Sequence, residues 1–257
     1  MKRELRDLYH SIIPTEYITV GGAYRNNIVI TAPHGGGMKP IFIPKRKYGK
    51  LLQDTYTRRI INGIIDKYRA DLKPLSLISD IHRSRVDFNR DIIEGAQGNH
   101  KAEELWRYWD YKMQSITDVL RNKFKKSLYI DIHSHNDNDS FQLGYNLSAR
   151  AYNELKNTRF TADKSTLFSL SDDQYNMIFG MSSIKKSLEH YGYSVYSPNG
   201  NEVYFNGGRG IETFSGNGIG AIQIEVPVSV AKEDFDGCIN ALYHAIDVFR
   251  VSNVPRN

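Results

Sequence analysis

Short apolar stretches alternate with longer amphipathic stretches along this chain. Six stretches have the length and residue pattern of strands, at residues 28–31, 75–79, 83–88, 128–132, 194–196 and 221–226. Four longer stretches carry apolar residues at helical spacing, at residues 51–69, 102–124, 173–191 and 232–250. This alternation predicts a three-layer α/β fold, with a mostly parallel or mixed central sheet flanked by helices. Residues 134–159 are rich in Asn, Asp and Ser and predict a long loop with room for a short helix.

The composition is that of an ordinary globular protein. The 257 residues suffice for one large α/β domain, and no low-complexity linker divides them, so we expect a single domain over residues 1–257. We find no run of about twenty apolar residues and no apolar signal-peptide core at the amino terminus, which favours a cytoplasmic protein without a membrane partner. Cys238 is the only cysteine, so any metal must be held by histidine and carboxylate.

The chain is moderately basic, with a formal charge of +5 and a pI near 9.1. Its Lys and Arg residues are scattered, and residues 45–47 form the densest cluster. This distribution does not favour nucleic acid as a partner, but it suits an acidic substrate, because a positive cleft concentrates anions. The sequence does not define the oligomeric state.

Two predicted strands each end in a histidine. His34 follows the apolar residues 28–30 and precedes three glycines, and His133 follows the apolar residues 128–130. Ligands of open α/β sheets bind outside the carboxyl ends of the strands, so both rings are candidate metal ligands. A turn-capping role for His34, or an exposed loop around His133 and His135, is the alternative. His135 lies on the same side of the strand as His133 and is a candidate substrate-binding residue.

Asp54 is a third candidate ligand. At 100° per residue it falls on the apolar stripe of the predicted helix 51–69, within about 20° of Ile61 and Ile65. A carboxylate in that position needs a partner, and zinc sites combine His with Asp or Glu. The alternative role for Asp54 is a helix N-cap.

A cationic face follows in the predicted strand 83–88. Alternation places Arg83, Arg85, Asp87 and Asn89 on one side, an arrangement suited to an anionic group such as a carboxylate. The alternative is a structural network of ion pairs with the aspartates of this segment.

Further along, Glu225 ends an apolar strand and follows a glycine-rich segment, residues 207–220. Beside a metal it is a candidate general base, and a plain edge-strand glutamate is the alternative.

Five motifs in order resemble the N-formylglutamate amidohydrolase family, which is related to the zinc carboxypeptidases and the aspartoacylase group. Residues 33–36 are similar to the family's Pro-His-Ser-Gly turn, residues 83–90 to its Ser-Arg followed by Asp-Leu-Asn-Arg, and residues 131–134 to its Asp-x-His-Ser. Residues 205–208 and 222–225 are similar to its Gly-Gly and Gln-x-Glu elements. The resemblance spans most of the chain.

The resemblance implies a zinc-carboxypeptidase-like fold, a bound Zn²⁺, and His34 and His133 as metal ligands. It also implies Glu225 as the base, and Asn89 with Arg90 as binders of the substrate's carboxylate. The Gly-Gly element implies that Gly207 and Gly208 contact the substrate.

Two positions depart from the family pattern. His82 stands where the family has serine, so Arg83 and Arg85 compete for the role of polarising the scissile carbonyl. Some relatives carry a glutamate ligand shortly after the first histidine, where this chain has Met38 and Lys39. Asp54 is the candidate that fills this gap.

The motifs together predict a zinc-dependent hydrolase that cleaves an amide bond in a small molecule or peptide bearing a carboxylate. Candidate substrates are an N-acyl amino acid, an N-formylglutamate-like compound or a glutamyl peptide, attacked by a metal-activated water with Glu225 as base. One alternative is a metal-dependent phosphoester hydrolase that uses His133 and His135 as a pair. Another is a carboxylate- or nucleic-acid-binding module without catalysis.

Overall fold

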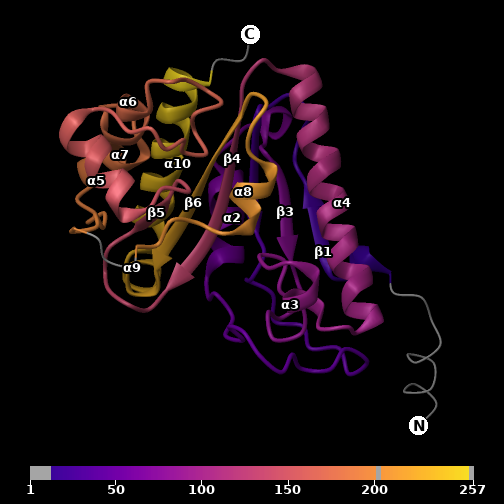
Figure 1. The fold of residues 1–257 in the computed structure, drawn as a ribbon. Helices are drawn as coiled ribbons and strands as arrows, with labels where there is room; N and C mark the ends of the chain where they lie inside the picture. The colour runs from indigo at the N-terminus through magenta and orange to yellow at the C-terminus, as the bar shows by residue number, and fades with distance from the viewer. Residues whose placement is uncertain (1–12, 201–203, 255–257) are drawn as a thin grey trace.

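The computed structural model describes residues 13–200 and 204–254. These residues form a six-stranded sheet with the strand order β1-β3-β2-β4-β6-β5 (Figure 1). The strands are β1 (Ile18–Gly21), β2 (Ile28–Ala32), β3 (Leu75–Ser79), β4 (Ser127–His135), β5 (Gln142–Gly144) and β6 (Ile219–Pro227). The four inner strands are parallel, and the edge strands β1 and β5 are antiparallel to their neighbours. The sheet is therefore mixed, as predicted.

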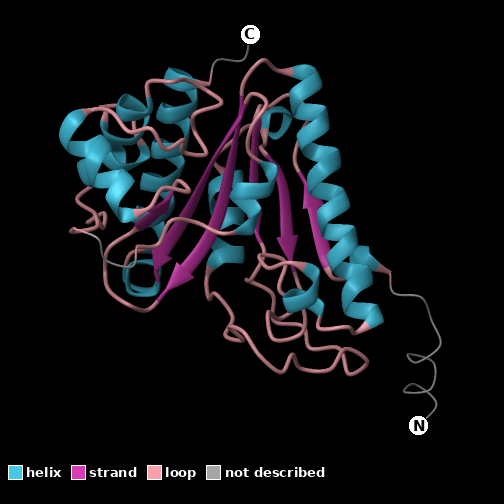
Figure 2. Cartoon of the chain, viewed as in Figure 1, coloured by secondary structure: helices cyan, strands magenta, loops and turns pink. Residues whose placement is uncertain are grey.

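Helices cover both faces of the sheet, which gives the three predicted layers (Figure 2). The α-helices are α2 (Thr57–Asp66), α3 (Ile92–Ala96), α4 (His100–Lys123), α5 (Ala149–Thr158), α6 (Gln174–Phe179), α7 (Ile184–His190), α8 (Arg209–Phe214), α9 (Val228–Glu233) and α10 (Phe235–Asn253). Two short 3₁₀ helices, η1 (Pro14–Glu16) and η2 (Ala70–Leu72), complete the elements. One apolar core joins the sheet to α2, α10 and the α5–α7 group, and the other joins it to α4 and α8.

Alternation along β4 and β6 explains how the sheet carries polar groups without losing its core. Ile130 and Ile132 of β4 and Ile222 and Ile224 of β6 belong to the core on the α2 and α10 side. The residues between them point to the opposite face, because side chains alternate along a strand. Asp131, His133, Gln223 and Glu225 therefore share one face, near the carboxyl ends of the parallel strands.

Several predicted elements need correction. Residues 83–88 are not a strand: they form turns, because their polar side chains are buried in ion pairs rather than alternating across a sheet. Residues 194–196 make only an isolated bridge, between Val195 and Phe141. The predicted helix 51–69 begins only at Thr57, and Gly180 ends α6, so the predicted helix 173–191 is split into α6 and α7. The predicted helix 232–250 is divided at Asp234, between α9 and α10.

The hydrophobic pattern of the sequence did not predict strands β1 and β5 or helix α5. The short strands β1 and β5 lie at the two edges of the sheet, and the predicted loop 134–159 contains both β5 and the ten-residue helix α5. Short edge strands carry few alternating positions, so their signal is weak. The helix predicted at 102–124 is present as α4, with shifted ends.

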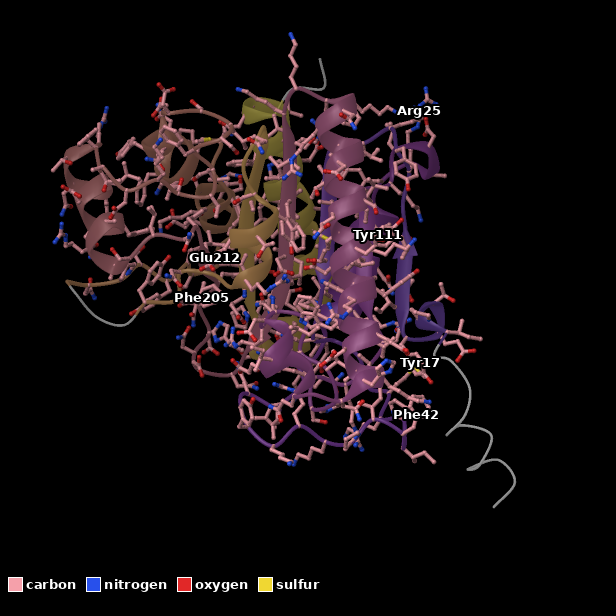
Figure 3. All side chains as sticks on the ribbon, turned by 45° about the vertical axis from the view of Figure 1, so that its right-hand side comes forward. Tyr17, Arg25, Phe42, Tyr111, Phe205 and Glu212 are labelled. Atoms are coloured by element: carbon pink, nitrogen blue, oxygen red, sulfur yellow. The ribbon has the colours of Figure 1, made fainter. Side chains whose placement is uncertain are left out.

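A long connection, residues 33–56, runs between β2 and α2 at the carboxyl ends of the strands. It is fixed to the segment after β3 by an isolated bridge between Met38 and Ile81. Tyr17 and Phe42 meet edge to face with ring centroids 6.2 Å apart, which joins η1's end to this connection (Figure 3). The connection is thus held against the sheet where the candidate ligands lie.

Within residues 13–200 and 204–254, every helix is too short or too polar to cross a membrane. The amino-terminal residues that bear on a signal peptide lie outside the described part of the chain.

Candidate metal centre and active site

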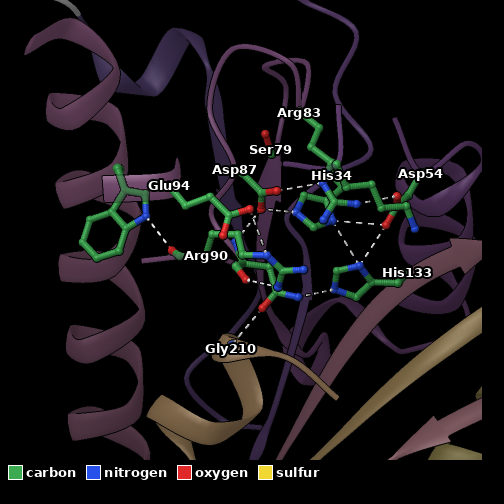
Figure 4. A network of polar contacts seen from close by, with 12 residues as sticks. His34, Asp54, Ser79, Arg83, Asp87, Arg90, Glu94, His133 and Gly210 are labelled. Atoms are coloured by element: carbon green, nitrogen blue, oxygen red, sulfur yellow. Dashed lines mark hydrogen bonds and ion pairs between the residues drawn. The ribbon is translucent and has the colours of Figure 1, made fainter. Parts of the chain in front are cut away.

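Three candidate ligands meet at the carboxyl end of the sheet. His34 follows β2, His133 lies in β4, and Asp54 lies in the connection before α2. The Nδ1 atoms of His34 and His133 are 3.2 Å apart, and Asp54 Oδ2 lies 3.2 Å from the first and 2.8 Å from the second (Figure 4). All three side chains are buried. The fold therefore brings together residues that are far apart in the sequence.

Each histidine is oriented by a second carboxylate on its other nitrogen. His34 Nε2 lies 2.7 Å from Asp87 Oδ1, and His133 Nε2 lies 3.1 Å from Asp131 Oδ2. A carboxylate that accepts the Nε2 proton fixes the orientation of the ring, so that Nδ1 is the nitrogen available to a metal. Both Nδ1 atoms point at the Asp54 carboxylate.

This donor set fits a divalent metal. Zinc binds imidazole nitrogen at about 2.0–2.1 Å and carboxylate oxygen at similar distances, which places tetrahedral ligand atoms about 3.3 Å apart. The three donor atoms here are separated by 2.8 to 3.2 Å. Two imidazoles and one carboxylate from three segments therefore form a site that could hold a metal ion.

Asp54 reaches the cluster for a different reason from the one predicted. It precedes α2, whose first residue is Thr57, so it does not lie on the apolar stripe of that helix. Tyr56 occupies the N-cap position, so the capping alternative is wrong as well. A backbone hydrogen bond of 3.2 Å from Asp54 N to His34 O holds the two residues side by side.

The charged groups of the cluster shift the pKa values of Asp54 and His133. Burial opposes ionisation of Asp54, but the adjacent His34 and His133 rings hold the pKa of its carboxyl well below the usual range. Burial also disfavours the charged form of His133, yet the Asp131 carboxylate beside it raises the pKa of the ring to about 10. In the metal-free protein His133 is therefore protonated at neutral pH, and a metal would have to displace that proton.

The two candidate arginines, Arg83 and Arg85, make different contacts in the structure. Arg83 is buried, with Nε 2.8 Å from Asp87 Oδ2 and Nη1 3.3 Å from Asp54 Oδ1. Arg46 adds a second buried cation, with Nη2 3.2 Å from Asp87 Oδ2. Asp87 thus accepts from two arginines and a histidine, and these contacts hold the pKa of its buried carboxyl well below the usual range.

Arg85 points elsewhere. Its Nη1 donates to the carbonyl oxygen of Ile43 at 2.7 Å. The ion-pair network proposed as the alternative is real, but its members differ from those expected, because Asp80 pairs with Arg58 and Asp91 caps α3. Of the two competing arginines, the structure brings only Arg83 to the candidate ligands.

A pocket of about 200 Å³ opens beside the cluster. The pocket-lining residues are Lys50, Arg83, Asn89, Arg90, His133, Phe205, Gly207, Gly208, Gln223 and Glu225. Six of the residues predicted for the site are therefore joined here to His133. Its cations, Lys50, Arg83 and Arg90, agree with the expectation of an acidic substrate.

Glu225 lies next to His133, since the two are register partners on β6 and β4. Its Oε2 is buried and has no hydrogen-bond partner within the described part of the chain. Burial raises the pKa of this carboxyl above its ordinary value. A buried carboxyl with a raised pKa beside a candidate metal centre is the arrangement required of a general base.

Another part of the pocket wall is built around Asn89. Asn89 Oδ1 accepts the backbone N–H of Gly210 at 2.9 Å, and a Cβ at Gly208 would overlap the Asn89 amide, so this glycine cannot be replaced without displacement. Trp106 Nε1 donates to the carbonyl oxygen of Arg90 at 3.0 Å. The segment predicted to bind a carboxylate is thus fixed to α4 on one side and to α8 on the other.

Arg209 is a second link between these elements. Its guanidinium lies 4.5 Å from the centroid of the Trp106 ring, and its Nη2 is 2.6 Å from Asp110 Oδ1. Arg209 begins α8, directly after Gly207 and Gly208 of the pocket wall. The position of that wall therefore depends on α4.

His135 is not brought to the cluster. Its Nε2 lies 3.1 Å from the carbonyl oxygen of Ser140, and its Nδ1 is 3.3 Å from the backbone nitrogen of Asp137. It stabilises the turn after β4 and is not among the residues that line the pocket. Its predicted contact with substrate has no support in this geometry.

Sequence reasoning did not assign four residues that the structure places at the site. Asp131 had a signal, since it precedes His133 by two positions on one strand face, but Asp87 was considered only as part of the cationic segment. Gln223 was noted only as part of a motif. Lys50 comes from an irregular connection, where periodicity gives no information.

The described residues form a three-layer α/β fold that carries the cluster of His34, Asp54 and His133 at the strand ends. No protein-family model and no curated protein matches the sequence. Among solved structures, the chain is similar to the N-formylglutamate amidohydrolase of Ralstonia eutropha JMP134, with a TM-score of 0.58 and 13% identity over 92% of this chain and 97% of that chain.

It is also similar to a gene product of Agrobacterium tumefaciens, with a TM-score of 0.60 and 12% identity over 96% of this chain and 99% of that chain. At such low identity these likenesses establish the fold alone. They confirm the fold implied by the sequence motifs, and the chemistry has to be argued from the site itself.

Proposed function

We propose that this protein is a metal-dependent hydrolase that cleaves an amide bond in a substrate bearing a carboxylate. The proposed ion is Zn²⁺, held by His34, Asp54 and His133, and the proposed substrates are an N-acyl amino acid, an N-formylglutamate-like compound or a glutamyl peptide. One observation carries the proposal: a buried, unpaired Glu225 stands beside His133 in a pocket that adjoins the three candidate ligands.

Glu225 is the proposed general base. Its unpaired Oε2 is available to take a proton from the attacking water and to give it to the leaving amine, so that one residue serves both proton transfers. A bound zinc ion would supply a Lewis acid that polarises the scissile carbonyl and lowers the pKa of water. His34 and His133 would hold that ion through Nδ1, because Asp87 and Asp131 engage the opposite nitrogens, and His133 would give up its Nδ1 proton on binding.

The rest of the pocket binds and orients the substrate in this proposal. Arg83 takes the role of polarising the carbonyl in preference to Arg85, because it lines the pocket while Arg85 does not. Asn89 and Arg90 bind the carboxylate, and Lys50 adds a third side chain for that anion. Gly207 and Gly208 form the wall against which the substrate packs.

The proposal is tested first by metal content. Protein purified without a metal-affinity step is analysed by inductively coupled plasma mass spectrometry after dialysis against limiting zinc. We expect one zinc per chain in the wild type, and loss of binding in folded His34→Ala and His133→Ala variants. His100→Ala removes an exposed histidine of α4 and is the matched control.

Activity is then screened on N-acyl amino acids and glutamyl peptides, with phosphoesters as the comparison class. Cleavage of an amide that depends on zinc and on the candidate ligands supports the proposal. A wild type that binds no zinc, or that cleaves phosphoesters and no amide, contradicts it. Because His135 is engaged by the turn after β4, the structure offers no His133–His135 pair for the phosphoester alternative.

A further inference from the structure

Gln223 is a buried polar residue of the pocket that the mechanism above does not use. It precedes Glu225 by two positions on β6, so both side chains leave the same face of the strand, with Cα atoms about 6.6 Å apart. Gln223 is 2% exposed and lines the pocket with Glu225. It is therefore a neighbour of the proposed base on the pocket surface.

The side-chain oxygen of Gln223 is buried without a partner. Its Oε1 accepts no hydrogen bond within residues 13–200 and 204–254, and leaving a buried acceptor unpaired is unfavourable. Two arginines that line the pocket are engaged elsewhere: Arg83 pairs with Asp54 and Asp87, and Arg90 pairs with Glu94 and the Asn89 carbonyl. The unpaired oxygen is thus an acceptor that a ligand in the pocket can satisfy.

The strand beside Gln223 lets the pocket wall approach closely. The register partner of Gln223 on β4 is Asp131, and its partner on β5 is Gly144, which has no side chain. A Cβ at Gly144 would lie 2.5 Å from the backbone nitrogen of Gly207, so the pocket wall packs directly over this glycine. A larger residue at this position would push the wall, and with it Gly207, away from Gln223.

Gln223 lies nearer the amino end of the parallel strands than the residues of the proposed metal centre. Glu225 pairs in register with the candidate ligand His133, whereas Gln223 pairs with Asp131, two residues closer to the amino end of β4. In a trans amide the C=O and N–H groups point in opposite directions. A scissile carbonyl directed at the candidate ligands therefore directs its N–H away from them, and Gln223 Oε1 is a buried acceptor of the pocket outside that ligand set.

From this geometry we propose that Gln223 accepts a hydrogen bond from the N–H of the scissile amide and so makes the site selective for amides over esters. The inference rests on the proposed function and adds a specificity-determining residue to it. An ester carries an oxygen in place of the N–H, so Gln223 Oε1 would stay unpaired in an ester complex. A site that hydrogen-bonds an N–H discriminates strongly against an analogue that lacks it.

The test compares two probes that differ in one group, N-acetyl-L-glutamate and its ester analogue 2-acetoxyglutarate. Calorimetry measures their binding to the zinc-loaded Glu225→Gln protein, in which hydrolysis is slow, with and without the additional change Gln223→Met. Methionine keeps the length of the side chain and removes the hydrogen bond. Gln223→Leu is the second variant, and thermal unfolding verifies that each variant folds.

We expect the Glu225→Gln protein to bind the amide about 10- to 100-fold more tightly than the ester, and the additional Gln223→Met change to abolish this preference while ester binding stays within about threefold. An unchanged amide preference overturns the role of Gln223, as does an equal loss of binding for both probes, which would indicate a structural role.

Kinetics separate the two proposals. If the zinc-loaded wild type cleaves the amide and Gln223→Met lowers kcat/KM for amide and ester alike, the inference about Gln223 fails while the proposed function stands. If the wild type cleaves no amide in the substrate screen, the proposed function fails. In that case the ratio of the two binding constants still decides whether Gln223 recognises an N–H group.

Discussion

Glu225 and His133 are register partners on adjacent parallel strands, and both are buried. The pairing sets a carboxyl whose Oε2 has no hydrogen-bond partner among the described residues beside a ring whose Nδ1 points at the candidate metal centre. The sheet itself therefore fixes the distance between the proposed base and a proposed ligand. The predictions below follow from this relationship and from the contacts around it.

Glu225→Gln is expected to abolish activity without affecting the metal. The amide cannot take a proton from water, so kcat should fall by about 10²- to 10⁴-fold. Zinc content should stay at one per chain, because Glu225 is not among the candidate ligands. Steady-state kinetics and elemental analysis of the same preparation measure both quantities, and a fully active variant with normal zinc would disprove the assignment of the base.

The same substitution should change how stability depends on pH in the metal-free protein. Burial raises the pKa of Glu225 above its ordinary value of 4.5, so the folded state holds its proton more tightly than the unfolded state. The free energy of unfolding therefore falls as the pH rises above about 4.5, and Glu225→Gln removes this loss. Thermal unfolding from pH 4 to pH 8 should show the variant gaining stability relative to the wild type as the pH rises.

Zinc uptake should release a proton from His133. The Asp131 carboxylate, acting against burial, raises the pKa of this ring to about 10 in the metal-free protein. The associated stabilisation is complete below about pH 6.5 and is lost as the pH rises toward 10. Calorimetry in buffers of different ionisation enthalpy counts the protons released. Asp131→Asn should reduce that number at neutral pH, and it should weaken zinc binding by about 10- to 100-fold.

Asp87→Asn should damage both stability and metal binding. The carboxylate accepts from Arg83 and Arg46 and orients His34, and all four side chains are buried. Removing its charge takes the ion-pair partner from buried Arg46 and leaves buried Arg83 with Asp54 alone, which costs about 3–5 kcal/mol. Chemical denaturation measures this loss. Asp118→Asn on the exposed face of α4 is the control, and equal effects of the two substitutions would refute the role given to Asp87.

Arg209→Ala should act on the pocket wall and not on the metal. Its stacking on Trp106 and its ion pair with Asp110 hold the start of α8, so we expect KM to rise about tenfold while zinc content is unchanged. Arg209→Lys should restore little, because lysine lacks the planar group that stacks. Arg107→Ala removes an exposed arginine of α4 and serves as the control. A fall in kcat with an unchanged KM would contradict a positioning role.

The inner architecture of the fold could be predicted because its signals are local. β2, β3, β4 and β6 are buried along their whole length, so they appear as apolar runs, and α4 has a regular apolar stripe. Residues 83–88 were misassigned because Arg83 and Asp87 alternate with apolar residues as in a strand. Their partners, Asp54 and Arg46, lie far away in the sequence, and local alternation carries no information about them.

The candidate site was predictable where chemistry coincides with a strand end. His34, His133 and Glu225 are polar residues at the ends of apolar strands, which marks them without knowledge of their neighbours. Asp54 was named from a helical spacing that it does not have, although its side chain does lie with the two histidines. Lys50 could not be found at all, since an irregular connection has no periodicity that would indicate where its side chains point.

The three candidate ligands are separated by 20 and 79 residues along the chain, and they meet only when the long connection 33–56 has been laid across the end of the sheet. An unfolded chain cannot chelate an ion with groups so far apart. In the proposed zinc-bound form the ion would bind the native state alone, and each tenfold excess of free zinc over its dissociation constant would stabilise the fold by about 1.4 kcal/mol. The ion would then act as a reversible cross-link between the three segments, and the stability of the folded protein would depend on the concentration of free zinc.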